Sequence, residues 1–271
     1  MAPAPDPKKV LGREPDMTVL DSFRIDDRVA IVTGASSGLG VGFALALAEA
    51  GANISLAARR EDRLTATRKL VEDTGRRAIT VRTDVTSPED CSAHVDATMH
   101  AFGRVDILVN NAGVGTAVPA TRETPEQFRS VIDINLNGCY WMAQACARVM
   151  QPGSSIINVT SVLGLTTVAL PQAAYASSKA GLIGLTRDLA QQWTGRKGIR
   201  VNALAPGYFE SEMTDQFRGG DYIETSVIPR TLMGRLGHAQ ELNAALIFLA
   251  SDASSYVTGI TLPVEGGMLT S

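Results

Sequence analysis

Tyr175 and Lys179 form the pair of residues in this sequence whose types and spacing best suit proton transfer. Side chains four residues apart project from one face of a helix. A free phenol has a pKa of about 10, and a nearby ammonium favours the phenolate and lowers that pKa. A phenol with a lowered pKa can exchange a proton with a substrate oxygen near neutral pH. Because Tyr-x-x-x-Lys is a common pattern, the pair by itself predicts no more than a surface contact.

Ser161 and Asn135 could complete such a site. Ser161 follows the apolar run 156–160, which is typical of a buried strand, and its hydroxyl could donate a hydrogen bond to a substrate oxygen. Asn135 stands among aliphatic residues in a helical pattern. A buried amide without partners costs roughly 1–3 kcal/mol, so Asn135 must either bind backbone groups or hold a water for a proton relay.

A glycine-rich segment near the start of the chain predicts a phosphate-binding turn. The segment 34–40 reads G-A-S-S-G-L-G, follows a β-rich run, and precedes a helical pattern from Val41 to Ala50. Glycine lets a phosphate approach the main chain, and the following helix N-terminus offers free N–H groups to a pyrophosphate. The spacing is G-x-x-x-G-x-G rather than G-x-G-x-x-G, and a tight turn without a ligand is the alternative.

The residues that follow the second predicted strand indicate which nucleotide would bind. An acidic residue at this point binds the adenosine ribose hydroxyls and favours NAD. Here the strand ends in Ala58, and the next residues, Arg59 and Arg60, can pair with a 2′-phosphate. NADP is therefore favoured, and NAD stays possible. Ser37 weakens the prediction because a basic residue there would be a second phosphate partner, and the arginines could instead be solvated residues of the next helix.

Apolar runs alternate with helical patterns along most of the chain. Ser87 with Pro88, and Thr124 with Gln127, carry the signatures of helix N-termini. The alternation predicts an α/β fold with a parallel sheet covered on both faces. Predicted strands are 29–33, 53–58, 78–81, 106–109, 155–160, 199–204 and 259–264; predicted helices are 41–50, 61–73, 124–150, 173–193 and 241–250, with another starting at Ser87. The segment 210–228 is predicted to be a mobile lid.

Composition limits the class of protein. Hydrophobic residues are 45% of the 271-residue chain and charged residues 20%, so a large core can form. The net charge of −3 without a basic run argues against nucleic acid as a partner. The lack of an apolar stretch of about 18 residues argues against a membrane span. Cys91, Cys139 and Cys146 fit free thiols of a reducing compartment, which predicts a cytoplasmic location.

Two further expectations concern metal ligands and the N-terminus. Cys91 and His94 are too few for a metal site, so no metal is expected and both are predicted to lie on a solvated helix face. Residues 1–21 are rich in proline, lack the apolar core of a signal peptide, and are predicted to form a flexible arm before a domain at 22–271. The arm could dock on a neighbouring subunit, or Met17 could be the true start.

Four motifs, in order along the chain, resemble those of the short-chain dehydrogenase/reductase family. They are T-G-A-S-S-G-L-G at 33–40, N-N-A-G at 110–113, Ser161, and Y-A-S-S-K at 175–179. Each motif is weak alone, but the set at these spacings is specific, and the resemblance runs from about Asp26 to the C-terminus. It implies a single doubly wound, Rossmann-type α/β domain with a seven-stranded parallel sheet.

The resemblance also implies roles for site residues. Tyr175 would be the general acid or base, Ser161 would orient the substrate oxygen, Lys179 would bind the nicotinamide ribose, and Asn135 would hold a water that links Lys179 to solvent. Ser211 stands where many members have Thr, near the nicotinamide carboxamide. The cofactor-binding residues expected are Gly34, Ser36, Ser37, Gly38, Leu39, Gly40, Arg59, Asp84, Val85, Asn111, Ala112, Gly113, Tyr175, Lys179, Pro206, Gly207 and Ser211.

The function expected is an NADP(H)-dependent oxidoreductase that interconverts a ketone and a secondary alcohol. The expected pocket residues are mostly apolar and slightly favour an apolar or 3-oxoacyl-type small-molecule substrate; they are Val114, Leu163, Leu165, Val168, Tyr208, Met213, Phe217 and Tyr222. The segment 230–267 also resembles gluconate and glucose dehydrogenases, so a sugar or polyol dehydrogenase is the alternative. The segment 257–267 is similar to the family's tetramer interface, which predicts a homotetramer.

Two other functions are less favoured. A non-catalytic, cofactor-binding protein would not need all four tetrad positions filled, as they are here. Enoyl reduction usually pairs a tyrosine and a lysine at a wider spacing than the four residues between Tyr175 and Lys179.

Overall fold

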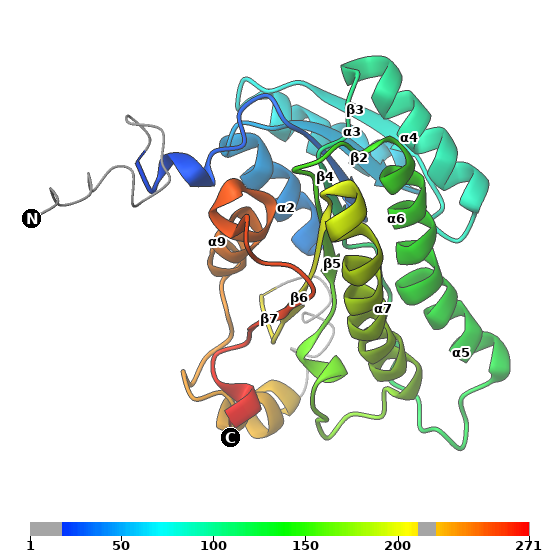
Figure 1. The fold of residues 1–271 in the computed structure, drawn as a ribbon. Coiled ribbons are helices and arrows are strands. Elements are labelled where there is room, and N and C mark those ends of the chain that lie inside the picture. The colour runs from blue at the N-terminus through cyan, green and yellow to red at the C-terminus, as the bar shows by residue number, and fades with distance from the viewer. Residues whose placement is uncertain (1–17, 211–220, 271) are drawn as a thin grey trace, which may run out of the picture.

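A computed structural model describes residues 18–210 and 221–270 and shows one seven-stranded parallel sheet in the order β3-β2-β1-β4-β5-β6-β7 (Figure 1). The strands are β1 (Val29–Thr33), β2 (Asn53–Ala58), β3 (Ala78–Arg82), β4 (Ile107–Asn110), β5 (Ser155–Val159), β6 (Arg200–Pro206) and β7 (Thr261–Val264). The predicted parallel sheet and Rossmann-type α/β fold are confirmed, and all seven predicted strands form near their expected bounds.

Two layers of helices cover the sheet. One apolar cluster packs the strands against α2 (Gly38–Glu49), α3 (Glu61–Glu72) and α9 (Ala239–Ala250). The other packs them against α4 (Pro88–Phe102), α6 (Gly138–Val149) and α7 (Ala173–Lys197), with α5 (Pro125–Ile132) leading into α6. In Figure 1, α2 and α9 lie on one side of the sheet and α6 and α7 on the other.

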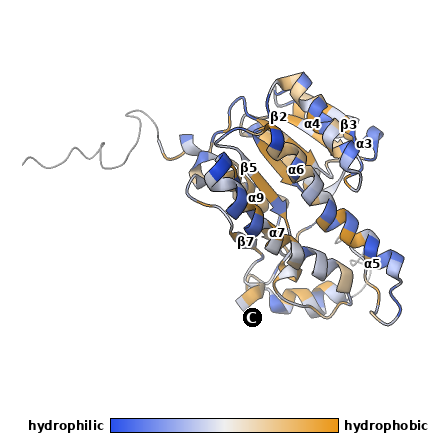
Figure 2. Ribbon diagram, turned by 45° about the vertical axis from the view of Figure 1, so that its right-hand side comes forward, coloured by the Kyte–Doolittle hydropathy of each residue, from blue (hydrophilic) through white to orange (hydrophobic). Residues whose placement is uncertain are grey.

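The central strands are mostly apolar because both of their faces are buried. Every residue of β1, β5 and β6 is buried. Figure 2 shows these hydrophobic strands between helices whose outer faces are hydrophilic. Burial on both faces explains why the strands read as continuous apolar runs rather than as alternating patterns.

Helix ends follow the signals in the sequence. Ser87 accepts a hydrogen bond from the Asp90 backbone at the start of α4, where Pro88 is the first residue. Thr124 and Gln127 form the predicted capping box at the start of α5. The helix that carries Tyr175 continues beyond the expected Trp193 to Lys197, and it ends where Gly198 adopts a left-handed conformation.

The expected continuous helix 124–150 is interrupted. A π-helical turn, η2 (Asp133–Asn137), separates α5 from α6 and contains Asn135. A π-turn adds one residue to the turn and shifts the side chains that follow it. The prediction of an uninterrupted helix was therefore wrong at the position of a candidate site residue.

Short helical turns complete the described chain. They are η1 (Asp21–Phe23), η3 (Val162–Gly164), η4 (Ile223–Val227), η5 (Ile228–Arg230), η6 (Asp252–Ser254) and η7 (Met268–Thr270). The described part of the predicted lid segment consists of residue 210, residues 221–222, η4 and the first residue of η5, whereas residues 211–220 lie outside the described ranges. Among the described helices, none combines the length and apolar character needed to cross a membrane.

Candidate active site

A cleft of about 590 Å³ opens at the carboxyl ends of β1, β2, β3 and β4, where the loops of such a sheet hold ligands. It brings together most of the expected cofactor-binding residues: Gly34, Ser36, Ser37, Gly38, Leu39, Arg59, Asp84, Val85, Asn111, Ala112 and Gly113. Gly40 is buried in the first turn of α2, and Pro206 and Gly207 lie at the end of β6. Ser211 lies outside the described residues.

The glycine turn between β1 and α2 has the conformation that its sequence requires. Gly34 has a φ of +67°, which favours glycine over other residues. A Cβ at Gly40 would overlap the Gly34 carbonyl, so the turn and the helix pack without space for a side chain. The Asn111 amide donates to the Thr33 carbonyl at 2.9 Å, which ties the loop after β4 to this turn.

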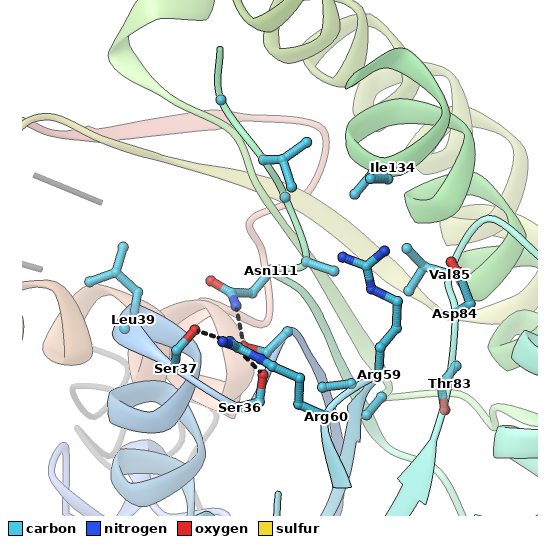
Figure 3. A pocket seen from close by; sticks show the side chains of 18 residues that line it. Ser36, Ser37, Leu39, Arg59, Arg60, Thr83, Asp84, Val85, Asn111 and Ile134 are labelled. Atoms are coloured by element: carbon cyan, nitrogen blue, oxygen red, sulfur yellow. Dashed lines mark hydrogen bonds between the residues drawn. The ribbon is translucent and has the colours of Figure 1, made fainter. Parts of the chain in front are cut away.

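Arg59 and Arg60 lie differently in the cleft. One Arg60 amino group donates to Ser36 Oγ at 3.1 Å and to Ser37 Oγ at 2.9 Å (Figure 3). Arg59 instead extends across the cleft toward Asp84 and Val85 (Figure 3). The sequence predicts Arg59 as the residue that marks NADP preference. In the structure, Arg60 is the residue whose guanidinium reaches Ser37.

Asp84 supplies a negative charge to the same wall. Burial would raise the pKa of its carboxyl, but hydrogen bonds from the Thr86 backbone and hydroxyl outweigh burial and lower the pKa, with help from Arg59 and Arg82. The two bonds from Thr86 measure 3.0 and 2.9 Å. The carboxylate is therefore charged and fixed within its turn, with Arg59 as its counter-charge.

Tyr175 and Lys179 share one face of α7, as their spacing predicts. The Lys179 side chain is only 4% exposed, and its ammonium donates to the Val159 carbonyl at 2.8 Å. The ammonium lies 5.7 Å from the centre of the Tyr175 ring. A buried ammonium requires such partners, and the carbonyl at the end of β5 holds this charge beside the phenol.

Gly113 and Gly115 connect this pair to the nucleotide cleft. A Cβ at Gly113 would lie 3.5 Å from the Lys179 ammonium and 3.3 Å from Asn135 Oδ1. A Cβ at Gly115 would lie 3.5 Å from the edge of the Tyr175 ring. Both glycines also line the cleft, so the phenol and the ammonium lie next to residues of its wall.

Asn135 uses its side chain to hold the loop after β4. Its amide oxygen accepts from the Val114 N–H at 2.8 Å, and its amide nitrogen donates to the Val114 carbonyl at 2.9 Å and to Ser178 Oγ at 3.0 Å. Both amide protons are thereby used. These contacts agree with the backbone-binding role of Asn135, and the water-holding role stays a prediction.

Ser161 begins the turn that follows β5. Its hydroxyl accepts from the Leu163 N–H at 3.1 Å and is nearly buried. A Cβ at Gly164 would lie 2.9 Å from the Lys179 backbone, so this turn packs directly on α7. The packing places the serine turn against the helix that carries Tyr175 and Lys179.

An apolar cluster lies on the other side of Tyr175. It joins Tyr175 with the expected Leu163, Val168, Tyr208 and Tyr222, and with residues the sequence did not single out: Val162, Ile223, Val227, Ile228, Leu236, Met268 and Leu269. The hydroxyls of Tyr208 and Tyr222 lie 2.9 Å apart. Burial and this contact raise the pKa of Tyr208, so its phenol stays protonated.

Two of the expected pocket residues do not join this cluster. Val114 lines the nucleotide cleft instead, and Leu165 is exposed. Met213 and Phe217 lie outside the described residues. The residues missed at Met268 and Leu269 follow the last strand, and no sequence motif marks them as neighbours of Tyr175.

The expectation for Cys91 and His94 was wrong. Neither lies on a solvated helix face; both are fully buried beneath the loop after β3. Burial lowers the pKa of His94 to about 4 and raises that of Cys91 to about 12. Across residues 18–210 and 221–270, no three His, Cys, Asp or Glu residues gather in a way that could hold a metal ion.

Comparison with known proteins identifies the family. Residues 34–269 match the family model described as Enoyl-(Acyl carrier protein) reductase. The chain is 36% identical to 2-dehydro-3-deoxy-D-gluconate 5-dehydrogenase of Escherichia coli (strain K12), over 93% of this chain and 99% of that protein. It is 37% identical to the 3-oxoacyl-(acyl-carrier-protein) reductase FabG of Chlamydia trachomatis, over 89% of this chain and 97% of that protein.

A solved structure agrees with these relatives. Gluconate 5-dehydrogenase from Burkholderia cenocepacia J2315, in complex with NADP and tartrate, superposes with a TM-score of 0.87 at 36% identity and covers 94% of this chain and 100% of that one. Fold, site and relatives therefore define one class: the chain belongs to the short-chain dehydrogenase/reductase family. It is an oxidoreductase of the kind that acts on CH–OH groups.

Proposed function

We propose that this protein interconverts a ketone and a secondary alcohol with NADP(H) as its cofactor. The observation that carries the proposal is the position of two glycines: Gly113 and Gly115 line the nucleotide cleft and also adjoin Lys179 and Tyr175. A nucleotide in the cleft would therefore lie next to the proton-transfer pair.

The cleft fits a phosphorylated dinucleotide. The turn 34–40 offers backbone without side chains at the N-terminus of α2, which suits a pyrophosphate. Arg60, held over Ser36 and Ser37, supplies a cation at the end of β2, where Ala58 offers no carboxylate to ribose hydroxyls. This donor set favours a 2′-phosphate, and the structural relative from Burkholderia cenocepacia contains NADP.

The chain's own groups would supply the proton and the positioning. When bound, the nicotinamide supplies or accepts the hydride. Tyr175 would transfer the proton to or from the substrate oxygen, and Ser161 would hold that oxygen by a hydrogen bond. Lys179, fixed by the Val159 carbonyl, would stabilise the phenolate, and Asn135 would hold the loop of Val114 in place.

The wall around Tyr175 favours an apolar or 3-oxoacyl-type ketone. Val162, Leu163, Ile223 and Val227 are buried there. The hydroxyl pair of Tyr208 and Tyr222 supports the alternative, a sugar or polyol substrate, because it offers hydrogen bonds inside that wall. Acetoacetyl-CoA and 5-keto-D-gluconate as substrates would decide between the two, since only one should give a high kcat/KM.

Replacing Tyr175 with Phe tests the reaction itself. The variant removes the proton-transfer hydroxyl, so kcat/KM should fall by about 10²–10⁴ while the affinity for NADPH stays close to that of the native protein. Steady-state oxidation of NADPH with a ketone panel and a binding titration would measure the two quantities. Activity retained in Tyr175→Phe would refute the proposed role.

The same proposal includes the bounds of the domain, the compartment and the oligomeric state. Residues 22–271 would form the catalytic domain and residues 1–21 an arm; Ile25 is buried and Phe23 packs near Phe248, which supports a boundary close to residue 22. The protein would be a cytoplasmic homotetramer. The buried free thiols support the compartment, and the exposed Tyr256 and Ile260 beside β7 support an interface there.

A further inference from the structure

His94 is a buried ionisable residue that the proposed reaction does not use. Its side chain is 0% exposed, and its ring packs from α4 against β2 and against Thr83, which follows β3. Nε2 is 2.9 Å from Ser55 Oγ in β2, and Nδ1 is 2.9 Å from Thr83 Oγ1, just after β3. A neutral imidazole has one donor and one acceptor, and a hydroxyl can take either role, so both contacts are hydrogen bonds in either tautomer.

The contact with Thr83 belongs to a set of three that fix the turn 83–85. The Asp84 N–H donates to Asp90 Oδ2 at 2.9 Å, and the Cys91 thiol donates to the Val85 carbonyl at 3.6 Å. The three residues that make these contacts, 90, 91 and 94, all come from the first turns of α4. All three residues of the turn line the nucleotide cleft.

His94 differs from Asp90 and Cys91 because it also reaches the neighbouring strand. Ser55 lies in β2, which ends at Ala58 and leads to Arg59 and Arg60, two further lining residues of the cleft. Ser55 Oγ is fixed in turn by Thr98 Oγ1 at 2.7 Å. The imidazole thereby adds a side-chain link between β2 and Thr83, next to the backbone hydrogen bond from the Thr83 N–H to the Ala58 carbonyl at 3.0 Å.

We propose that His94 is a positioning residue for nucleotide binding: it fixes the side chain of Thr83 at the start of the turn 83–85. It acts through Thr83 and does not itself touch the ligand. The inference rests on the proposed binding of NADP(H) in this cleft. Loss of the link to Thr83 should weaken nucleotide binding without altering proton transfer at Tyr175.

Two variants at one position separate the two contacts of the ring. The amide of His94→Asn falls near the place of Nδ1 and can still bond Thr83, whereas the longer His94→Gln places its amide near Nε2 and can still bond Ser55. His94→Gln should raise the Kd for NADPH about tenfold, and His94→Asn should keep it within about threefold of the native value. At saturating NADPH, kcat should be unchanged in both.

Thr98→Val is the matched control. Thr98 belongs to the same buried network, but it contacts Ser55 and the backbone of His94 and not the turn 83–85. It should lower the melting temperature as the His94 variants do, while the Kd for NADPH stays native. A merely structural role for His94 predicts the same Kd in all three variants.

The outcomes separate this inference from the proposed function. Equal values of Kd for His94→Asn and His94→Gln would overturn the positioning role, although NADPH-linked ketone reduction would still stand. A native protein that neither binds NADPH nor oxidises it with any ketone would remove the proposed function first. If the His94 variants do not fold, Thr83→Val serves instead, because it removes the hydroxyl that His94 Nδ1 contacts: a raised Kd supports the role of this contact, and a native Kd overturns it.

Discussion

Arg60 brings a positive charge to Ser37, a position that is itself uncharged. Ser37 is a hydroxyl at a place where a cation would bind a 2′-phosphate, and sequence reasoning counted this against NADP. The side chain of Arg60 spans the gap and donates to Ser36 and Ser37. Arg59 stands across the cleft and contributes to the lowered pKa of Asp84. The two adjacent arginines therefore have different neighbours, which their sequence positions alone do not reveal.

Substitution of Arg60 with Ala should distinguish the two nucleotides. Loss of the guanidinium should raise the Kd for NADPH about tenfold and leave the Kd for NADH nearly unchanged, because only NADPH carries the 2′-phosphate. Fluorescence titration of both nucleotides measures this. Arg68→Ala, which alters an exposed pair with Glu72 on α3, should change neither affinity. An equal loss for NADH would show that Arg60 does not recognise the phosphate.

At the scale of elements, α4 and the helix of Asn135 show what periodicity can and cannot reveal. Residues 91, 94, 95 and 98 share one face of α4 and are all buried, so the spacing did contain a signal that His94 faces the core. The π-turn at 133–137 left no such signal. It is accompanied by hydrogen bonds between Asn135 and Val114. Those contacts depend on a loop 21 residues earlier in the chain.

The buried His94 should make the stability of the fold depend on pH. Burial lowers its pKa from 6.5 to about 4, so the unfolded chain binds more protons than the folded one between these values. The free energy of unfolding should therefore decrease as pH falls from about 6.5 to 4, by up to about 3 kcal/mol from this residue. Above pH 6.5 the contribution is complete and constant.

Urea denaturation at a series of pH values would measure this dependence. His94→Gln cannot titrate, so its free energy of unfolding should lose that part of the slope between pH 6.5 and 4. His100→Gln is the control, because His100 lies exposed in the last turn of the same helix and should keep the native slope. A slope unchanged in His94→Gln would contradict the assignment.

At the scale of the whole molecule, the sequence was sufficient for the sheet and for most of the cleft. Seven runs rich in apolar residues became seven parallel strands, and the inner ones are continuous apolar runs because they are buried on both faces. The position of the cleft follows from the strand order, because the loops that carry the motifs all begin at the carboxyl ends of the strands. The wall at Tyr175 was harder to predict because Met268 and Leu269 reach it only through the path of the chain after β7.

Assembly can be tested at the same scale. Tyr256 is fully exposed and Ile260 is partly exposed next to β7, in and beside the segment that predicts a tetramer interface. Light scattering should give a mass of four chains, and Tyr256→Glu should reduce it by placing a charge in an apolar contact. Leu70→Glu, at an exposed site on α3, should leave the mass unchanged. A native protein of one-chain mass would refute the tetramer.

Gly113 leaves little space for a side chain beside the proton-transfer pair. A methyl group on its α-carbon would stand 3.3 Å from Asn135 Oδ1 and 3.5 Å from the Lys179 ammonium. Even alanine at this position would therefore press on Asn135, whose amide holds the loop of Val114. A larger residue at position 113 would disturb that loop and the surroundings of Lys179 together.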